Sequence, residues 1–288
     1  MRVPVKNKSR RATSTLSARL STRVKLQADP IGQVVACFYG RVVSLGTFSA
    51  DLTARLQDLR IGLQLPTFTS RRRKIEKELH LLIRRLAMHG LLEYCLQRSQ
   101  DHKDQVVIEP QFANYWPETP PLDNADVLVL SRFAYMRRRG KDLIIESPRA
   151  GALFKICDPK VATVIFALST PQSLKRLRQQ DGFPGTELLS LLLDCQILFK
   201  IEPGSSNGLR QVEGDYNLVF WDFHDLLFHA RSTEGRQANP LGALYPYIGV
   251  VPALPAVRPP WPGKKINLRK FTAADSDVRS PVTRLLQH

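Results

Sequence analysis

The stretch ALFKICDPKVATVIFAL, residues 152–168, joins a short β-rich run directly to a helix. Asp158 stands before Pro159, and an acidic N-cap with proline at the first helical position is a typical helix start. The apolar residues that follow recur at helical spacing: Val161, Val164, Ile165 and Leu168. A strand and a helix in so short a stretch favour a mixed α+β fold.

A hairpin precedes this helix and a second helix follows it. Residues 142–145 and 152–156 are both β-rich and flank a polar segment with proline and glycine. A further helix begins at Thr186 and is nearly all leucine, so we expect it at the centre of a core. A strand over residues 197–201 then closes the unit. We predict a winged-helix-like unit over residues 127–203.

A similar order of elements occurs about 110 residues earlier. Residues 34–38 and 41–45 predict a hairpin, and the hydroxyl of Ser49 is expected to cap the helix that follows. A longer helix is expected to end at Gly90, before an apolar strand. The separation exceeds that of stacked repeats and indicates a duplicated domain, with the first unit over residues 29–105.

The fold class that we predict is α+β, with two tandem winged-helix-like units followed by a bridging helix and a proline-rich extended segment. Residues 1–28 are basic and are expected to form a flexible arm. Residues 106–126 are expected to be a linker. Three of its aromatic residues can hold it against one unit: Phe112, Tyr115 and Trp116. Residues 204–288 contain a helix over 220–229 and a proline-rich strap over 240–262.

Composition narrows the class of partner. The chain of 288 residues has a formal net charge of +16 and a pI near 10.0, which indicates a negatively charged partner. No apolar run is long enough to span a membrane and no signal peptide is evident, so we expect a cytoplasmic protein without membrane association. The cysteines lie far apart and are expected to be buried thiols: Cys37, Cys95, Cys157 and Cys195.

Basic residues at the start of the long helix of the first unit are the strongest local signal. Cations stacked at the positive end of a helix are unfavourable unless an anion binds there, although a solvated basic turn is an equally good reading. The candidate residues for binding a peptide or an anion are Arg71, Arg72, Arg73, Lys74, Arg84 and Arg85. A second basic run over residues 137–141 is expected to be plain surface.

Motifs for catalysis or metal binding are weak. Residues 204–208 match the nucleophile-elbow pattern, but a second polar loop follows them where a helix is required. His224 and His229 lie five residues apart and so point away from each other on a helix. We predict no catalytic, cofactor-binding or metal-binding residues in this chain.

Three stretches resemble the N-terminal, non-flavin region of SagB/ThcOx-type dehydrogenases, the enzymes that oxidise azoline rings to azoles in ribosomally made peptides. They are residues 130–137 leading to 146–149, residues 223–232, and residues 252–260, in the expected order. The resemblance implies tandem winged-helix or peptide-clamp modules and a helix over 221–232 that bridges toward a nitroreductase-like domain. It places FMN in a partner domain, because the sequence ends at His288 before the family's flavin-binding motif.

The function that this resemblance implies is binding of a precursor peptide, through its leader, and scaffolding of a flavin domain that is a separate partner or a continuation. A split enzyme, a fragment and a degenerate relative all remain open. The alternative is a winged-helix DNA-binding regulator. The leucine-rich helix that starts at Thr186 leaves few polar groups for base contacts, so we expect at most weak, salt-dependent nucleic-acid binding. A purely structural subunit is the third hypothesis.

Overall fold

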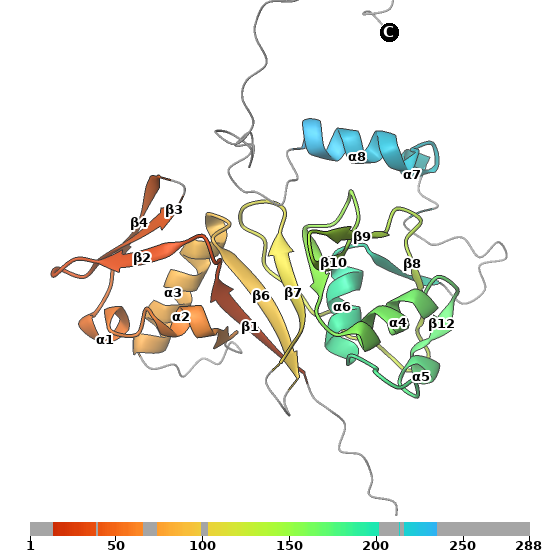
Figure 1. Cartoon of the computed structure of the whole chain (residues 1–288), viewed down its shortest axis with the longest axis horizontal. Helices are drawn as coiled ribbons and strands as arrows, with labels where there is room; N and C mark the ends of the chain where they lie inside the picture. Colours follow the sequence, from red (N-terminus) through yellow and green to blue (C-terminus); the bar gives the residue numbers. More distant parts are fainter. Residues whose placement is uncertain are drawn as a thin grey trace, which may run out of the picture. The chain divides into compact units, whose positions relative to one another are not determined.

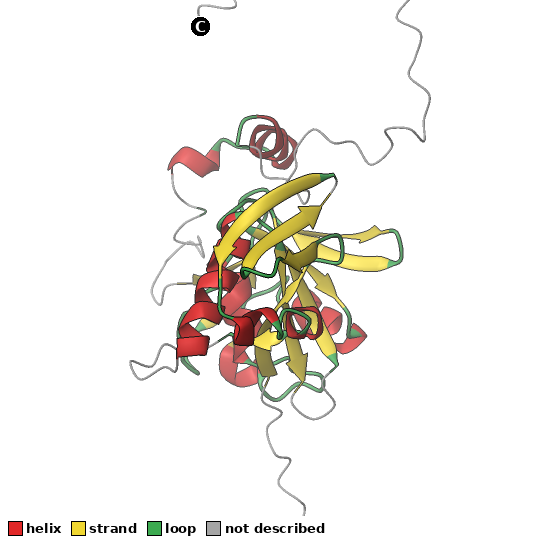
Figure 2. Cartoon of the chain, turned by 90° about the vertical axis from the view of Figure 1, so that its left-hand side faces the viewer, coloured by secondary structure: helices red, strands yellow, loops and turns green. Residues whose placement is uncertain are grey.

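The structure is a computed structural model, and it describes residues 14–38, 40–65, 74–98, 103–201, 213 and 216–234. Both helices and strands are present along these residues, which confirms the mixed α+β class (Figure 2). None of the described helices has the length and apolar character needed to cross a membrane.

The first half of the chain contains a three-stranded meander framed by further strands and helices. Its elements are β1 (Ser14–Leu20), β2 (Lys25–Ala28), β3 (Gln33–Phe38), β4 (Arg41–Thr47), α1 (Ala50–Thr53), α2 (Asp58–Ile61), β5 (Leu63–Gln64), α3 (Lys74–Met88) and β6 (Leu92–Arg98). β7 (Asp104–Pro110) follows. The predicted hairpin is β3 and β4, which pair antiparallel up to Phe38 and Arg41.

The second half has a similar order, but one helix precedes its two-residue strand and two follow it, whereas in the first half two precede the short strand and one follows. Its elements are β8 (Val127–Leu130), β9 (Tyr135–Arg139), β10 (Asp142–Glu146), β11 (Ala152–Ile156), α4 (Pro159–Ala167), β12 (Gln172–Ser173), α5 (Leu174–Leu177), α6 (Thr186–Asp194) and β13 (Leu198–Ile201). In each half the first strand lies between a two-residue strand and the closing strand, as β5-β1-β6 and as β12-β8-β13. The expected hairpin, helix and strand are therefore present twice.

Local signals in the sequence explain where the helices begin and end. The carboxylate of Asp158 accepts a hydrogen bond from the amide of Lys160 at 2.9 Å and Pro159 opens α4, as predicted. Gly90 has φ 65° and ends the turn after α3, in the left-handed region that favours glycine. Ser49 is the N-cap residue of α1 as expected, but the predicted capping bond is wrong, because its hydroxyl donates instead to Glu78 Oε2 of α3 at 2.5 Å.

A seven-stranded sheet joins the two halves (Figure 1). Its order is β5-β1-β6-β7-β11-β10-β9, and every described pairing in it is antiparallel. β7 is the shared strand: Ile108 lies opposite Tyr94 of β6 on one side and Phe154 of β11 on the other. The meander β2-β3-β4 of the first half forms a separate sheet.

Two expectations about connecting segments are wrong. Residues 14–28, expected in a flexible arm, contain β1 and β2, because β1 pairs along its whole length with β6, from Ser14 opposite Arg98 to Leu20 opposite Leu92. Residues 106–110, expected in a linker, lie in β7, where Val106 and Ile108 are fully buried. Residues 1–13 lie outside the described part.

The aromatic residues after β7 contact both halves rather than one. Tyr94 of β6 donates to the carbonyl of Tyr115 at 2.9 Å, and the Tyr115 hydroxyl lies 3.4 Å from the sulfur of Cys195. The ring of Trp116 packs edge to face against Tyr94. Buried residues of both halves thus form one continuous hydrophobic core.

A helix packs on the second half through a small core of its own. α8 (Phe223–Ser232) follows α7 (Tyr216–Val219), and Asp222 caps α8 by accepting from the amide of His224 at 2.9 Å. Buried Phe133, Leu218 and Leu226 form the contact. The helix expected over residues 220–229 is therefore confirmed, whereas the predicted proline-rich strap lies outside the described residues.

Candidate functional site

The outer edge of β4 is unpaired among the described residues. The amide of Asp29 donates to the carbonyl of Gln33, and antiparallel pairs alternate between bonded and non-bonded. Val35 and Cys37 of β3 are therefore bonded to β2 and not to their β4 partners, Ser44 and Val42. The amides of Val42 and Ser44 therefore point away from β3, toward the free edge. Val42 is also 66% exposed. A free edge with outward amides and carbonyls can accept an extended peptide.

The second half shows what such an edge can hold. β11 occupies the same place in its meander as β4, since each is the third strand of the meander and leads into the helices. The outer edge of β11 is covered by β7, with residues Ala152 to Ile156 paired antiparallel to Pro110 through Val106. One of the two equivalent edges is thus filled by the chain itself, and the other has no strand partner in the part of the chain that the structure describes.

The helix α3 supplies side chains next to β4. A bulge inserts Leu45 between the pairs Val35–Ser44 and Val34–Gly46, and the Leu45 carbonyl accepts a hydrogen bond from Arg85 Nη1. The Arg85 guanidinium lies against Gly46, whose φ is 100° and where any Cβ would collide with it. α3 is therefore fixed to β4 by a charged group at the bulge.

A second contact fixes the start of α3 near β4. Both the amide and the hydroxyl of Ser49 donate to Glu78 Oε2, at 3.1 and 2.5 Å. These bonds lower the pKa of Glu78 below its ordinary value of 4.5, the hydroxyl bond contributing most. Glu78 is therefore ionised at neutral pH, and its carboxylate accepts hydrogen bonds from Ser49.

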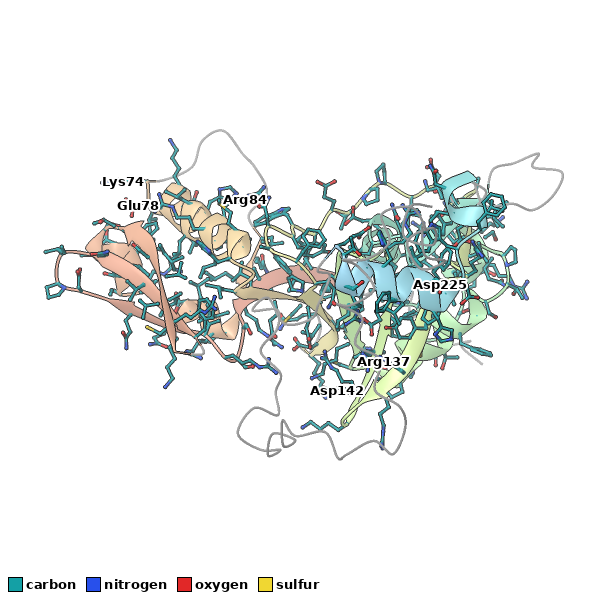
Figure 3. All side chains as sticks on the ribbon, turned by 90° about the horizontal axis from the view of Figure 1, so that it is seen from above. Lys74, Glu78, Arg84, Arg137, Asp142 and Asp225 are labelled. Atoms are coloured by element: carbon teal, nitrogen blue, oxygen red, sulfur yellow. The ribbon has the colours of Figure 1, made fainter. Side chains whose placement is uncertain are left out.

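The structure separates the basic residues that the sequence singled out. Lys74 is 87% exposed and lies 4.0 Å from Glu78, at the N-terminal end of α3 (Figure 3). Arg85 lies along the same stripe of the helix, toward β4. Arg84 lies instead over the ring of Trp116, 3.6 Å from its centroid. Arg71, Arg72 and Arg73 lie outside the described residues.

A buried ion-pair cluster was missed from the sequence. The Glu146 side chain is 3% exposed and accepts from Arg137 at 2.8 and 3.0 Å and from Arg231 of α8 at 3.0 Å. Burial and then the neighbouring Glu146 raise the pKa of Tyr135 beside it. The basic run expected to be plain surface is therefore partly structural, since Arg139 also pairs with Glu109 at 2.6 Å. Arg137, Glu146 and Arg231 all lie in the stretches that resemble the dehydrogenase family. That resemblance was the one signal in the sequence that could have pointed to this cluster.

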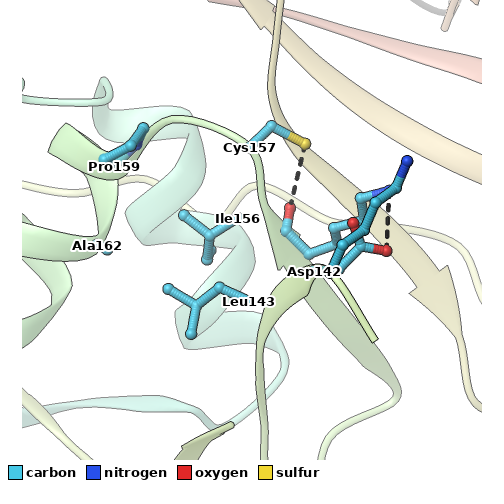
Figure 4. A pocket seen from close by; sticks show the side chains of 8 residues that line it. Asp142, Leu143, Ile156, Cys157, Pro159 and Ala162 are labelled. Atoms are coloured by element: carbon cyan, nitrogen blue, oxygen red, sulfur yellow. Dashed lines mark hydrogen bonds and ion pairs between the residues drawn. The ribbon is translucent and has the colours of Figure 1, made fainter. Parts of the chain in front are cut away.

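A shallow cavity of about 390 Å³ lies between the β10–β11 hairpin and the start of α4 (Figure 4). Asp142 and Lys155 form an ion pair across 3.2 Å at its wall, and Leu143, Ile156 and Ala162 supply apolar surface. No aromatic ring lines it. A flavin needs a surface for its ring system and cations free for its phosphate, so these residues do not fit FMN.

The remaining candidates form no reactive centre in the described residues. The elbow-like residues 204–208 lie outside them, and His229 packs on Trp221 at 5.2 Å while His224 is exposed. Within this part of the chain no group of three or more His, Cys, Asp or Glu is placed to hold a metal.

The cysteines differ from one another in exposure. Cys95 and Cys195 are buried as expected, Cys37 is half-buried, and Cys157 is exposed, which corrects the expectation for that residue. Burial raises the pKa of Cys195 to about 11.

Comparison with known proteins finds a family match within the second half. Residues 128–238 match the family model described as cyanobactin oxidase ThcOx. This match confirms the resemblance noted in the sequence: the part of the chain from β8 through α8 is a region related to ThcOx/SagB-type azoline dehydrogenases. Strands β1 to β7 lie before the matched residues. No curated protein matches the chain.

Proposed function

Because residues 128–238 form a ThcOx-type region, we propose that this protein binds and presents a precursor peptide for an FMN-dependent SagB-type dehydrogenase. In this proposal the leader of the peptide adds as an extended strand to the edge of β4. A flavin domain, either a separate chain or a continuation, then oxidises azoline rings in the same peptide. The chain described above supplies the holding surface and the scaffold.

We also infer that each half is a winged-helix unit. The order of meander, helices and closing strand in both halves, with β5-β1-β6 repeated as β12-β8-β13, supports this inference. An exposed sheet edge can bind an extended peptide as an added strand. A duplicated unit therefore has two equivalent edges, of which β7 covers one.

The single observation that carries the proposal is the antiparallel pairing of β7 with the outer edge of β11. It supports the idea that the third strand of the meander accepts an antiparallel strand, since β7 pairs with β11 over five residue pairs. The equivalent edge of β4 offers the outward amides of Val42 and Ser44 without such a partner among the described residues. We therefore propose one peptide per chain, bound at β4.

The charge beside β4 favours an acidic peptide. Arg41 at the start of β4 and Lys77 on α3 are exposed, as is Lys74. On α3, the carboxylate of Glu78 already accepts hydrogen bonds from the amide and the hydroxyl of Ser49. A peptide with carboxylates would approach this surface with favourable electrostatics, and the +16 net charge acts in the same direction.

FMN belongs to the flavin domain in this proposal. The described cavity does not fit it, so no step of the oxidation is assigned to residues of this chain. The contribution proposed for the chain is to raise the local concentration of the substrate peptide next to the flavin domain.

The test begins with a display library of random peptides, selected against the full-length protein. Selected peptides are synthesised, and their dissociation constants are measured on the parent protein and on Val42→Pro. Proline removes the outward amide and one ladder bond, which contributes about 0.5–1.5 kcal/mol, and its ring adds a steric penalty. We expect binding to weaken about tenfold, which corresponds to about 1.4 kcal/mol.

The matched control is Ala28→Pro on β2, the opposite edge of the same meander. The amide of Asp29 donates to the carbonyl of Gln33, so by alternation the amide of Ala28 also points outward. This variant should leave binding unchanged. Ser44→Pro serves as a second β4 variant if Val42→Pro does not fold. Slower hydrogen exchange at the amides of Val42 and Ser44 on adding peptide would support the proposal directly.

Two results would overturn the proposal. One is selected peptides that bind equally well to both β4 variants and leave exchange at β4 unchanged. The other is tight, sequence-selective binding of duplex DNA at physiological salt, which would favour the winged-helix regulator instead.

A further inference from the structure

We infer that Arg85 sets the register of the bound peptide by pairing with an Asp or Glu side chain that precedes the strand-forming residues of that peptide. This inference rests on the proposed function, because it requires a peptide on β4. It adds a specificity rule: the ligand is an extended peptide with one carboxylate at a fixed position, rather than any acidic peptide.

The position of Arg85 is the first step. Its guanidinium lies at the bulge, where Nη1 donates to the Leu45 carbonyl and the group lies against Gly46. A strand added to β4 can pair along Val42 and Ser44, but at Leu45 it meets a carbonyl that has already accepted a hydrogen bond and a bulky cation. The added ladder therefore ends at the bulge, beside Arg85.

The unused hydrogen-bonding capacity of Arg85 is the second step. A guanidinium has five N–H donors, and the Leu45 carbonyl takes up only one nitrogen. Within the described residues no ion pair of Arg85 occurs, and besides Leu45 and Gly46 its guanidinium contacts the ring of Phe48, with 5.6 Å from Cζ to the centroid. The side chain is half-buried, so a carboxylate reaching it would form a charge-assisted bond with partial protection from solvent.

Direction gives the third step. β7 runs antiparallel to β11, so by the equivalence of the two meanders the peptide runs antiparallel to β4. A chain in that direction passes Gly46 and Leu45 first, then Ser44, and then Val42. The residue beside Arg85 therefore comes earlier in the peptide than the residues that pair with β4. We expect selected peptides to share an Asp or Glu at that N-terminal position.

The fit of an Arg rather than a Lys is the fourth step. Arg85 must donate to Leu45 and still present a second nitrogen to the ligand, which a planar fork can do and a single ammonium group cannot do with the same geometry. Gly46 is required for the same reason, because a side chain there would displace the guanidinium.

A double-mutant cycle tests the inference. The full-length protein and Arg85→Met are each titrated with a peptide from the display selection and with the same peptide carrying Gln or Asn in place of its conserved acid. We expect Arg85→Met to weaken the acidic peptide about tenfold to hundredfold and to leave the amide peptide nearly unchanged. Arg85→Lys should recover only part of the loss.

Each outcome is decisive. If Arg85→Met weakens both peptides equally, Arg85 only supports β4 and the register inference fails, while the peptide-binding proposal stands as long as Val42→Pro still weakens binding. The register inference also fails if the selected peptides share no acid at one position. If Val42→Pro has no effect on any peptide, the proposed function fails and takes this inference with it.

Discussion

Replacing Glu146 by Gln should destabilise the second half and loosen α8. The carboxylate is 3% exposed and accepts three hydrogen bonds, two from Arg137 and one from Arg231. Buried charge-assisted bonds contribute about 1.5–3 kcal/mol each. The guanidinium groups are 42% and 37% exposed, so they regain water when the carboxylate is lost, and most of that sum must be discounted. We expect the free energy of unfolding to fall by about 2 kcal/mol.

The assay is urea unfolding followed by tryptophan fluorescence, with the free energy of unfolding extrapolated to water. Hydrogen exchange is measured in parallel at the amides of α8, which should exchange faster because the bond to Arg231 is weakened. Glu109→Gln is the matched control. Its partner Arg139 lies at 2.6 Å, but Glu109 is 26% exposed, so we expect a loss of at most about 0.5–1 kcal/mol.

The reasoning would be refuted by a Glu146→Gln variant within about 0.5 kcal/mol of the parent protein, a change too small for a buried charged group. It would also be refuted if the two variants lost the same free energy, since burial would then make no difference. A loss in stability without faster exchange in α8 would mean that Arg137 alone accounts for the effect.

Two further predictions concern the first half and the thiols. Ser49→Ala should raise the pKa of Glu78 toward 4.5, as measured by carbon-detected NMR titration, and an unshifted pKa would contradict the cause assigned to it. Because the pKa is lowered in the folded protein, this contribution to stability is present above the unfolded pKa and disappears as the pH falls through the folded value. Maleimide at mildly alkaline pH should modify exposed Cys157 in the folded protein, whereas buried Cys95 and Cys195 should react only after unfolding. Mass spectrometry of the labelled peptides checks this order, and early labelling of Cys195 would contradict it.

Local chemistry made much of the second half predictable. A cap, a proline and a run of apolar residues within a few positions determine where α4 begins, and Asp158 and Pro159 act there as expected. Four leucines of α6 are buried as their local pattern predicts, Leu188, Leu189, Leu191 and Leu192, and Leu193 is half-buried. The two hairpins beside Gly40 and in residues 142–156 were also predictable, because a turn and its flanking strands are adjacent in sequence.

Long-range pairing was not predictable in the same way. β1 was mistaken for part of a flexible arm, because the segment is short and polar and its partner β6 begins more than 70 residues later. β7 was taken for a linker, since nothing in residues 104–110 shows that both of its edges are paired. The bond between Arg85 and Leu45 depends equally on a distant contact, although the sequence did single out Arg85.

The shared strand β7 has a consequence for anyone who divides this protein into pieces. A boundary drawn at the start of the family match would leave β7 behind and strip β11 of its neighbour, uncovering Leu153 and Phe154 along an unsatisfied row of amides and carbonyls. Such a fragment would expose an unpaired strand edge, which can pair with the same edge of another copy and cause aggregation. The half that contains the family match and the half before it therefore share one sheet and one core, and we expect neither to be stable when it is expressed alone.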